Sequence, residues 1–74
     1  MKMPTKERVD WRKKRYIGKR IRVLAMPEDP HPVPVGTEGT CYDVDGIGQL
    51  QMEWDNGSTL SLLPGIDSFY LIGG

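Results

Sequence analysis

The sequence predicts an all-β fold: a small, strongly bent barrel of five short strands that follows a basic helical arm. Three observations lead to this prediction. Residues 49–54 alternate strictly between polar and apolar side chains, which is typical of a strand with one buried face. Glycine and proline interrupt the chain at short intervals after residue 18, as they do in small all-β domains. A helical pattern is confined to residues 5–17, which hold six of the ten basic residues.

The helix of the arm is predicted over residues 5–17. Thr5 can accept a backbone hydrogen bond at its start, and Gly18 supplies a stop at its end. An isolated helix of this length is marginal in water. We therefore expect it to pack on the rest of the chain through Val9 and Tyr16, which fall on one side at about 100° per residue.

The other side of this helix is basic and aromatic. Within about 100° of arc it carries three arginines and one indole: Arg8, Trp11, Arg12 and Arg15. Guanidinium groups bind phosphates in a bidentate manner, and an indole placed among them can stack on an unpaired base. This side of the helix is therefore a candidate binding face.

Five strands are predicted from period-two alternation and from the turn residues between them. They cover residues 19–26, 39–44, 49–54, 58–63 and 68–72. In the third strand Leu50, Met52 and Trp54 share one face and are expected in the core. Asp55-Asn56-Gly57 follows directly and has the composition of a hairpin turn.

Residues 27–34 are predicted to form an extended loop. They hold four of the six prolines of the chain. Because proline lacks the donor that a strand ladder needs, a central strand is excluded here. The side chains of this loop are candidates for contact with a partner.

Length and composition exclude several classes of protein. Seventy-four residues suffice for one small domain, and no apolar run is long enough to span a bilayer. The N-terminus lacks the apolar segment of a secretory signal. Cys41 is the only cysteine, which excludes an internal disulfide and favours a packed thiol in the cytoplasm. With one histidine and one cysteine, neither an enzyme nor a cofactor is expected.

Four segments of the barrel region match a known pattern. They read GKRIRV at residues 18–23, PVGTEGT at 34–40, WDNG at 54–57 and LPGID at 63–67. In this order they resemble the SH3-like barrel family known as domain of unknown function 4314, which occurs in phages, plasmids and integrated elements of bacteria. The resemblance covers about residues 18–72. It implies a five-stranded SH3-like β-barrel and a phage or mobile-element origin, and it implies no activity.

The expected domain organisation follows from this resemblance. Residues 1–17 form the basic helical arm, which lies outside the resemblance, and residues 18–74 form the SH3-like β-barrel. All ten basic residues lie within residues 1–22, whereas residues 23–74 carry eight of the ten acids and no base. The net charge of zero therefore conceals a strong separation of charge, which is typical of contact with nucleic acid or a membrane, or of an arm and a body with separate roles.

The leading hypothesis is a small non-enzymatic module that binds DNA or RNA through its arm. The candidate residues are Lys6, Arg8, Trp11, Arg12, Lys13, Lys14, Arg15, Lys19, Arg20 and Arg22. Because these cations would contact phosphates rather than base edges, we expect low sequence specificity. Two alternatives remain open: the arm could lie on its own acidic barrel, or it could bind an acidic patch of a protein partner.

A second hypothesis is a protein-interaction module or an inhibitor of a host protein. Its candidate residues come from the proline-rich loop and from the acidic face of the barrel: Pro30, His31, Pro32, Pro34, Tyr42, Asp43, Asp45 and Glu53. Carboxylates without nearby cations could imitate phosphates in a partner's groove. A third possibility is weak, salt-sensitive self-association of arm and barrel.

The acidic side chains have simpler interpretations as well. Carboxylates in turns usually accept hydrogen bonds from backbone amides, as expected for Asp45, Asp55 and Asp67. Glu28, Asp29 and His31 are close in sequence, but prolines restrict their convergence and no fourth ligand is evident. No metal site is therefore predicted.

Overall fold

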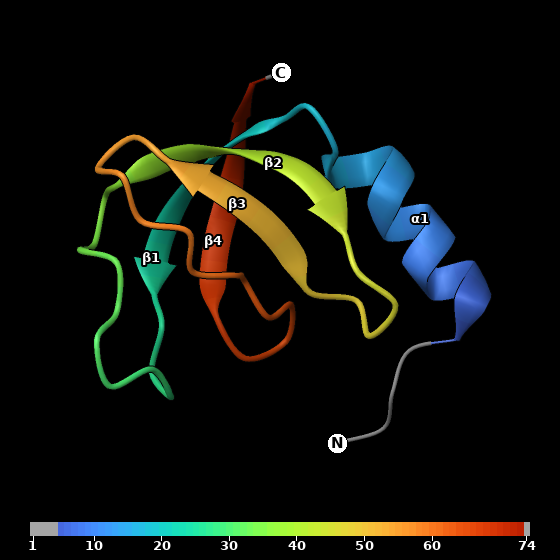
Figure 1. Cartoon of the computed structure of the whole chain (residues 1–74), viewed down its shortest axis with the longest axis horizontal. Helices are drawn as coiled ribbons and strands as arrows, with labels where there is room; N and C mark the ends of the chain where they lie inside the picture. The colour runs from blue at the N-terminus through green and yellow to red at the C-terminus, as the bar shows by residue number, and fades with distance from the viewer. Residues whose placement is uncertain (1–4, 74) are drawn as a thin grey trace.

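The computed structural model describes residues 5–73, which form one helix and one sheet (Figure 1). The helix α1 spans Lys6–Tyr16, and the strands are β1 (Arg20–Ala25), β2 (Glu38–Val44), β3 (Leu50–Trp54) and β4 (Ser68–Gly73). All neighbouring strands are antiparallel, in the order β3-β2-β1-β4. The predicted helix and four of the five predicted strands are thus confirmed to within one residue at each end.

The predicted closed barrel of five strands is wrong. In the described residues the sheet has four strands and stays open, and residues 58–63 do not form the expected fourth strand. Leu62 forms an isolated bridge with Leu50 of β3, through two hydrogen bonds of 2.9 Å, and the Ser58 carbonyl accepts from the Trp54 amide at 3.1 Å. The SH3-like barrel that the resemblance implies is therefore replaced by a mostly β fold with an open sheet.

Local hydrogen bonds explain why this strand does not form. The Leu60 carbonyl accepts from the Trp54 indole at 2.8 Å, and the Leu60 amide donates to the Ser58 hydroxyl at 3.3 Å. The Ser58 amide donates to the Asn56 side chain at 3.0 Å. Side-chain partners of this kind compete with a strand ladder for the same backbone groups. The segment therefore follows a turn-like path after β3.

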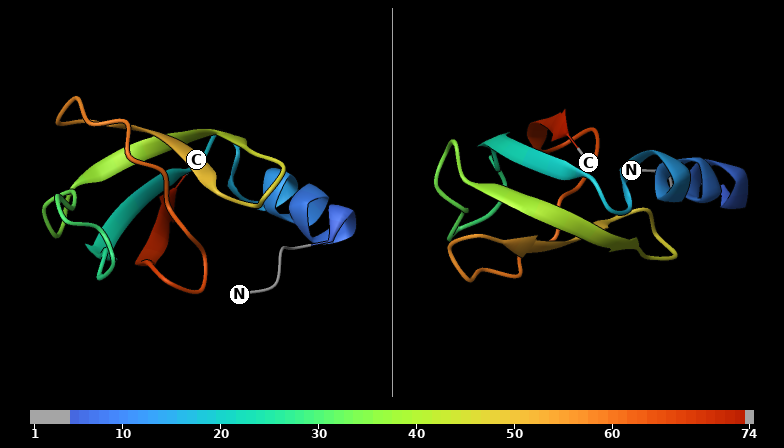
Figure 2. Two further views of the ribbon diagram at one scale, coloured as in Figure 1. Left: turned by 60° about the horizontal axis from the view of Figure 1, so that its bottom comes forward. Right: turned by 90° about the horizontal axis from the view of Figure 1, so that it is seen from above.

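The sheet curls around a single core, so its edge strands β3 and β4 lie on opposite sides of that core (Figure 2). Register shifts between Cys41 and Asp43 and between Val23 and Ala25 mark the places where strand pairing is interrupted. Such irregularities increase the local bend of a strand. Curvature thus comes from interrupted pairing as well as from the ordinary twist.

Gly39 on β2 permits a close contact between β2 and β3. A Cβ atom at this position would lie 2.7 Å from a ring carbon of Trp54 and 2.8 Å from the carbonyl oxygen of Glu53. Trp54 is only 4% exposed, as its place beside Leu50 and Met52 in the alternating pattern predicts. The absence of a side chain at position 39 therefore lets the indole pack across β2.

The core draws on every part of the described chain. Its fully buried members lie on the inner faces of the strands and on the segment after β3: Ile21, Val23, Cys41, Val44, Leu50, Met52 and Leu62. Met26 and Val33 from the loop between β1 and β2 join them, and Val9 of α1 is 7% exposed in the same cluster. The prediction of a packed Cys41 is confirmed, and its thiol donates to the Asp43 carbonyl at 3.2 Å.

The helix α1 is packed against the sheet and both of its ends are satisfied. Thr5 caps it by accepting from the Arg8 amide at 3.2 Å, and Gly18 adopts a φ of +81° just beyond its end. The Gly18 amide donates to the Cys41 carbonyl at 2.7 Å, which ties the turn to β2. Tyr16 makes an edge-to-face contact with Phe69 of β4, with ring centroids 5.8 Å apart.

Candidate nucleic-acid interface

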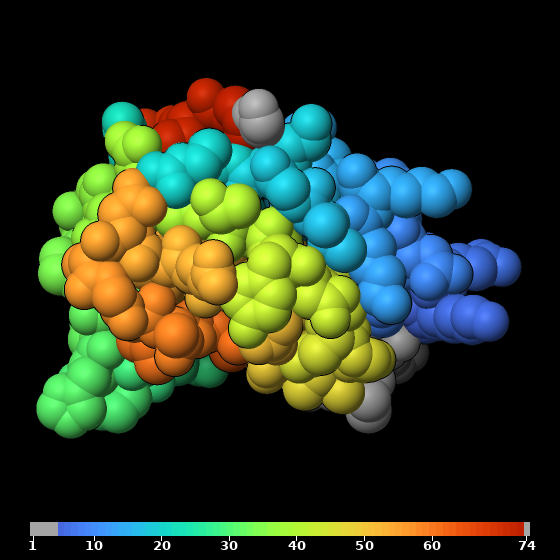
Figure 3. Space-filling view, turned by 45° about the horizontal axis from the view of Figure 1, so that its top comes forward, coloured from blue at the N-terminus to red at the C-terminus, as the bar shows by residue number. Residues whose placement is uncertain are grey.

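The helix α1 presents its basic side chains at one end of the molecule (Figure 3, blue). Five of them are exposed: Lys6, Arg8, Lys13, Lys14 and Arg15. Within residues 5–73 none of these five forms a salt bridge. Because Val9 faces the core, the opposite side with Arg8, Trp11 and Arg15 faces solvent. We call the whole exposed surface of α1, which carries these five cations and Trp11, the basic face of α1.

Trp11 lies exposed in this face. Its side chain is 54% exposed, and its ring makes an edge-to-face contact with Tyr16, with centroids 6.3 Å apart and an interplanar angle of 87°. Beside it is an open hollow of about 310 Å³, lined by Thr5, Glu7, Arg8 and Trp11. The indole of Trp11 is therefore accessible from solvent, and its role in binding stays a prediction.

Arg12 has a different role from the five exposed cations. It is half-buried, and its Nη1 donates to the carbonyl oxygen of Gly48 at 3.0 Å. Gly48 lies in the turn between β2 and β3, thirty-six residues further along the chain. Arg12 therefore braces the helix against the sheet. Lys19 is half-buried in the connection from α1 to β1, where its carbonyl accepts from the Cys41 amide at 3.1 Å.

Arg20 on β1 is already paired within the molecule. Its guanidinium forms a bidentate ion pair with Asp55, with Nη1 2.9 Å from Oδ1, and donates to the Thr40 hydroxyl at 3.1 Å. A Glu38 carboxylate oxygen lies 3.7 Å away. The hydrogen bond with Asp55 raises the pKa of Arg20, and the same bond lowers the pKa of Asp55. Asp55, predicted to cap a turn, instead neutralises this arginine.

Arg22 is paired in the same way on the next outward position of β1. Its Nη2 lies 2.6 Å from Glu38 Oε2, directly across the strand pair, and its Nη1 donates to the Tyr70 hydroxyl at 2.7 Å. The guanidinium carbon also lies 5.6 Å from the centroid of the Tyr70 ring. These hydrogen bonds to Glu38 and Tyr70 raise the pKa of Arg22.

The ten predicted nucleic-acid-binding residues therefore fall into two groups. The first group, Lys6, Arg8, Trp11, Lys13, Lys14 and Arg15, is exposed on α1. Arg8, Trp11 and Arg15 lie on the side away from Val9, whereas Lys6 and Lys13 lie nearer to it. The second group, Arg12, Lys19, Arg20 and Arg22, faces or contacts the sheet. Sequence reasoning missed Glu38, Asp55 and Tyr70 as partners of the strand arginines. Alternation places Arg20 and Arg22 on one face, but only the register of β1 with its neighbours brings those partners opposite them.

The predicted partner groove is not brought together. Pro30, His31, Pro32 and Pro34 are exposed in the loop between β1 and β2. Figure 1 places this loop on the opposite side of the molecule from the turn between β2 and β3. Tyr42 and Asp43 are exposed at the end of β2 that leads into this turn, and Glu53 is exposed on β3.

Asp45 of the predicted groove accepts hydrogen bonds from residues of the turn in which it lies and of the strand that follows. It accepts from the amides of Ile47 and Gln49, at 3.1 and 2.8 Å, and from the side chain of Gln51 at 3.1 Å. The prediction that Asp45 caps backbone amides is thereby confirmed. Its carboxylate is already hydrogen-bonded on both oxygens, so it is a poor mimic of a free phosphate.

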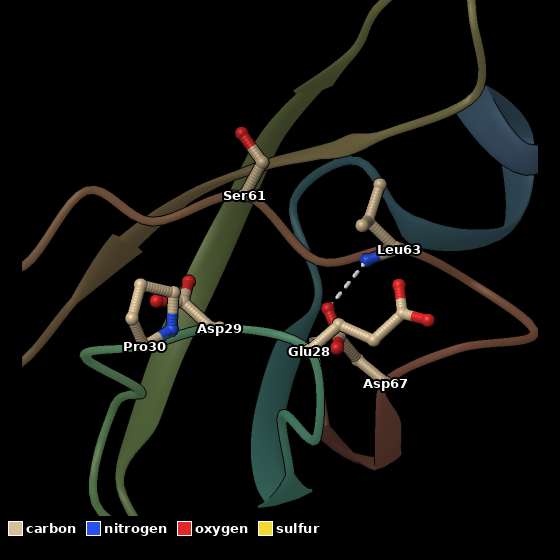
Figure 4. A pocket seen from close by; sticks show the side chains of 6 residues that line it. All are labelled: Glu28, Asp29, Pro30, Ser61, Leu63 and Asp67. Carbon is tan, nitrogen blue, oxygen red and sulfur yellow. Dashed lines mark hydrogen bonds between the residues drawn. The ribbon is translucent and has the colours of Figure 1, made fainter.

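A second hollow, of about 240 Å³, lies between the loop after β1 and the turn before β4 (Figure 4). Its lining is Glu28, Asp29, Pro30, Ser61, Leu63 and Asp67. Asp67 is 8% exposed and accepts from the Leu63 amide at 2.9 Å, which confirms its predicted role in a turn. Burial raises the pKa of Asp67, the Leu63 bond opposes this, and Asp29 and Glu28 raise it further.

Neither metal binding nor membrane insertion is supported by a feature of the described residues. Among residues 5–73 no group of three or more histidine, cysteine, aspartate or glutamate side chains is placed to hold a metal ion. Glu28 and Asp29 share the second hollow, whereas His31 is not among its lining residues. The helix α1 is neither long nor apolar enough to cross a bilayer.

Comparison with known proteins gives one match. The family model described as "Domain of unknown function (DUF4314)" matches residues 5–72. The match includes α1, so the helix that sequence reasoning placed outside the resemblance lies within it. Comparison with curated proteins gives no match, and comparison with solved structures gives none either.

Proposed function

We propose that this chain, which belongs to the DUF4314 family, is a small non-enzymatic module that binds nucleic acid through the basic face of α1. One observation carries the proposal. Five exposed cations lie on one helix without an ion-pair partner among residues 5–73, while Arg20 and Arg22 on the sheet are neutralised by carboxylates. Cations that are left without internal partners remain available for an external polyanion.

The charge around the sheet favours approach by way of the helix alone. A phosphate next to Arg20 or Arg22 would also lie close to Asp55 or Glu38, whose negative charge would repel it. At physiological salt such effects act over about 8 Å, so they decide locally which surface a phosphate chain can reach. The acidic sheet thus orients the ligand toward α1.

Binding of this kind is mostly independent of sequence. Lysine and arginine contacts to phosphate oxygens position a nucleic acid without reading its base edges. If all five exposed cations contact phosphates, the slope of log K against log salt would be about −4.5 on duplex DNA. The resemblance implies a bacterium that carries a phage or mobile element as the setting, and the single cysteine favours its cytoplasm.

A salt titration of binding tests the proposal. Affinity of the full chain for a short duplex and for a single strand is measured by fluorescence anisotropy at several salt concentrations. The variant Arg8→Gln/Lys14→Gln/Arg15→Gln should weaken binding to both and reduce the slope by about 2.7. Unchanged affinity and slope for both nucleic acids would contradict the proposal.

A charge-matched control separates contact from net charge. The variant Asn56→Asp/Thr59→Glu/Ser68→Glu makes the same change of three charges at exposed or half-exposed polar positions outside α1. Because these positions would not touch phosphates, the slope should stay within about 0.5 of the wild type. An equal loss of slope in both variants would indicate a net-charge effect without a defined interface.

A protein partner is the second candidate, and a specific surface favours it. Tyr42 on β2 is 53% exposed, and Tyr70 on β4 is 41% exposed and accepts a hydrogen bond from Arg22. Aromatic side chains and arginine are enriched in the centres of protein interfaces. Pull-down with an Asp43→Lys/Glu53→Lys variant tests it. Loss of the partner there, and retention in the Arg8→Gln/Lys14→Gln/Arg15→Gln variant, would support this function over the first.

A further inference from the structure

We infer that the natural ligand of the basic face is single-stranded nucleic acid, and that the hollow beside Trp11 takes one unpaired base. This inference rests on the proposed function, because the cations of α1 must first hold the sugar–phosphate chain. It adds the class of nucleic acid and the position at which a base is bound.

The two tryptophans of the chain differ sharply in their surroundings. Trp54 is 4% exposed and its indole N–H donates to the Leu60 carbonyl, so it serves the core. Trp11 is 54% exposed and lies on the side of α1 away from Val9. No hydrogen bond from its indole occurs among the described residues. Packing of the sheet therefore does not account for a tryptophan at position 11.

The indole of Trp11 is held in place before any ligand binds. Its edge-to-face contact with Tyr16, at 6.3 Å between centroids, restricts its rotation, and Tyr16 is itself packed on Phe69. A ring that is already ordered loses little freedom when a second ring stacks on it. Trp11 thus offers a preformed surface for an aromatic group.

The lining of the hollow suits a base better than a phosphate. Arg8 lies three residues before Trp11 and Glu7 lies four before it, so both side chains flank the indole on the helix surface. A phosphate inside the hollow would be repelled by the Glu7 carboxylate, whereas an uncharged base would not. The phosphate chain would instead run along the side that carries Arg8 and Arg15.

Stacking on Trp11 discriminates between single and double strands. In a duplex the faces of the bases are stacked on one another, and a protein reaches only their edges and the phosphates. In a single strand a base face is free to stack on an aromatic side chain. The cations of α1 therefore contribute to the binding of both forms, whereas Trp11 contributes only to the binding of the single strand.

The test compares Trp11→Ala and Trp11→Phe with the wild type on three probes of equal length. The probes are a single-stranded oligonucleotide without secondary structure, the matching duplex, and a single strand in which the bases are replaced by abasic sites. Trp11→Ala should weaken binding of the single strand by about 5- to 150-fold and leave the duplex and the abasic strand within about twofold. Trp11→Phe should retain most of the affinity.

Tyr42→Ala is the matched control, because Tyr42 is also an exposed aromatic residue, 53% against 54% for Trp11, but lies on the sheet. It should change none of the three affinities. Tryptophan fluorescence gives a direct signal: the single strand should quench the wild type but not Trp11→Phe, in which only the buried Trp54 remains.

The outcomes separate this inference from the proposed function. If Trp11→Ala weakens all three probes equally, or none of them, the base site is overturned while binding through the cations stands. If the wild type binds no probe, or the triple variant of Arg8, Lys14 and Arg15 binds as the wild type does, the proposed function itself fails. Circular dichroism confirms in each case that the variant is folded.

Discussion

Arg20 and Asp55, thirty-five residues apart, form a bidentate ion pair on the outer face of the sheet. Arg20 belongs to the basic N-terminal part of the sequence and Asp55 to its acidic remainder. The pair shows that part of the separated charge is already compensated within the molecule. The basic face of α1 remains outside this compensation.

Removal of Asp55 should strengthen nucleic-acid binding. Asp55→Asn takes away the carboxylate that neutralises Arg20 and repels phosphates, so Arg20 becomes available for one further phosphate contact. The slope of log K against log salt should become steeper by up to about 0.9, and affinity should rise several-fold at low salt. Anisotropy titration measures both. The double variant Arg20→Gln/Asp55→Asn should return to the wild-type slope, and failure to do so would refute this role of the pair.

The ion pair of Arg20 and Asp55 makes the stability of the protein depend on pH. Arg20 lowers the pKa of Asp55 in the folded protein. The ion pair therefore stabilises the fold fully above the pKa of Asp55 in the unfolded chain, about 3.9, and this stabilisation is lost as pH falls through the folded pKa. Thermal melts of the wild type and Asp55→Asn should therefore differ slightly at pH 7 and converge in strong acid. A difference that stays constant down to the lowest pH would contradict this assignment.

Arg12 and Arg15 should respond differently to the same substitution. Arg15→Gln removes an exposed cation and should reduce the salt slope by about 0.9, with little change in stability. Arg12→Gln removes the hydrogen bond to the Gly48 carbonyl and should cost about 0.5–1.5 kcal/mol of unfolding free energy, with a smaller effect on the slope. Urea unfolding and anisotropy together distinguish the two roles. Equal changes of unfolding free energy in both variants would show that Arg12 does not stabilise the packing of α1 on the sheet.

Gly39 should not tolerate a methyl group. In Gly39→Ala the new Cβ would lie 2.7 Å from the Trp54 ring and 2.8 Å from a backbone oxygen, so strand or indole must shift, at about 1–3 kcal/mol. Gly46→Ala is the control, since its Cβ would meet no atom within 4 Å. Urea unfolding should show a loss for Gly39→Ala that is at least 1 kcal/mol larger, and similar values for both would contradict the contact.

Asp67 should make the protein less stable as pH rises. Burial and the nearby Asp29 and Glu28 raise the pKa of Asp67 in the folded state, so the folded protein binds the proton more tightly than the unfolded chain. Stability is then highest below the unfolded pKa of about 3.9 and decreases as pH rises through the folded pKa. Asp55 has the opposite effect, because its pairing makes the protein more stable as pH rises. The pH dependence of stability in the wild type is therefore compared with that of Asp67→Asn and of Asp55→Asn separately.

Two variants of Asp67 separate its charge from its hydrogen bond. Asp67→Asn keeps an oxygen that accepts from the Leu63 amide and removes the buried charge, so it should equal or exceed the wild type in stability at pH 7. Asp67→Ala leaves that amide without its partner and should cost about 1–3 kcal/mol. Chemical unfolding at pH 7 measures both, and a greater loss in Asp67→Asn than in Asp67→Ala would contradict the interpretation.

Sequence reasoning located the helix and four strands because their signals are local. Thr5 caps α1 through an amide three residues away, and the alternation of Leu50, Met52 and Trp54 needs only six consecutive residues. The strand predicted over residues 58–63 was wrong for a related reason. Leu60 lies in a segment with the right alternation, but the Trp54 indole and the Ser58 hydroxyl occupy its backbone groups.

The candidate site was predicted in part. The exposure of Trp11 and Arg15 follows from the helical repeat once Val9 is taken as the buried side. The pairing of Arg22 with Glu38 could not be predicted, since it depends on the register between β1 and β2. A shift of one residue in that register would have turned every side chain of the strand to the other face.

The sequence by itself determined where the helix and strands lie, which side of each is buried, and that the positive charge is gathered at one end of the chain. These properties depend on neighbours within a few residues. Tertiary structure alone decided that the sheet stays open and that, among residues 5–73, Arg20 and Arg22 have carboxylate partners whereas the cations of α1 have none. Both outcomes depend on contacts between residues far apart in the chain, and such contacts form only when the strands pair and the sheet bends.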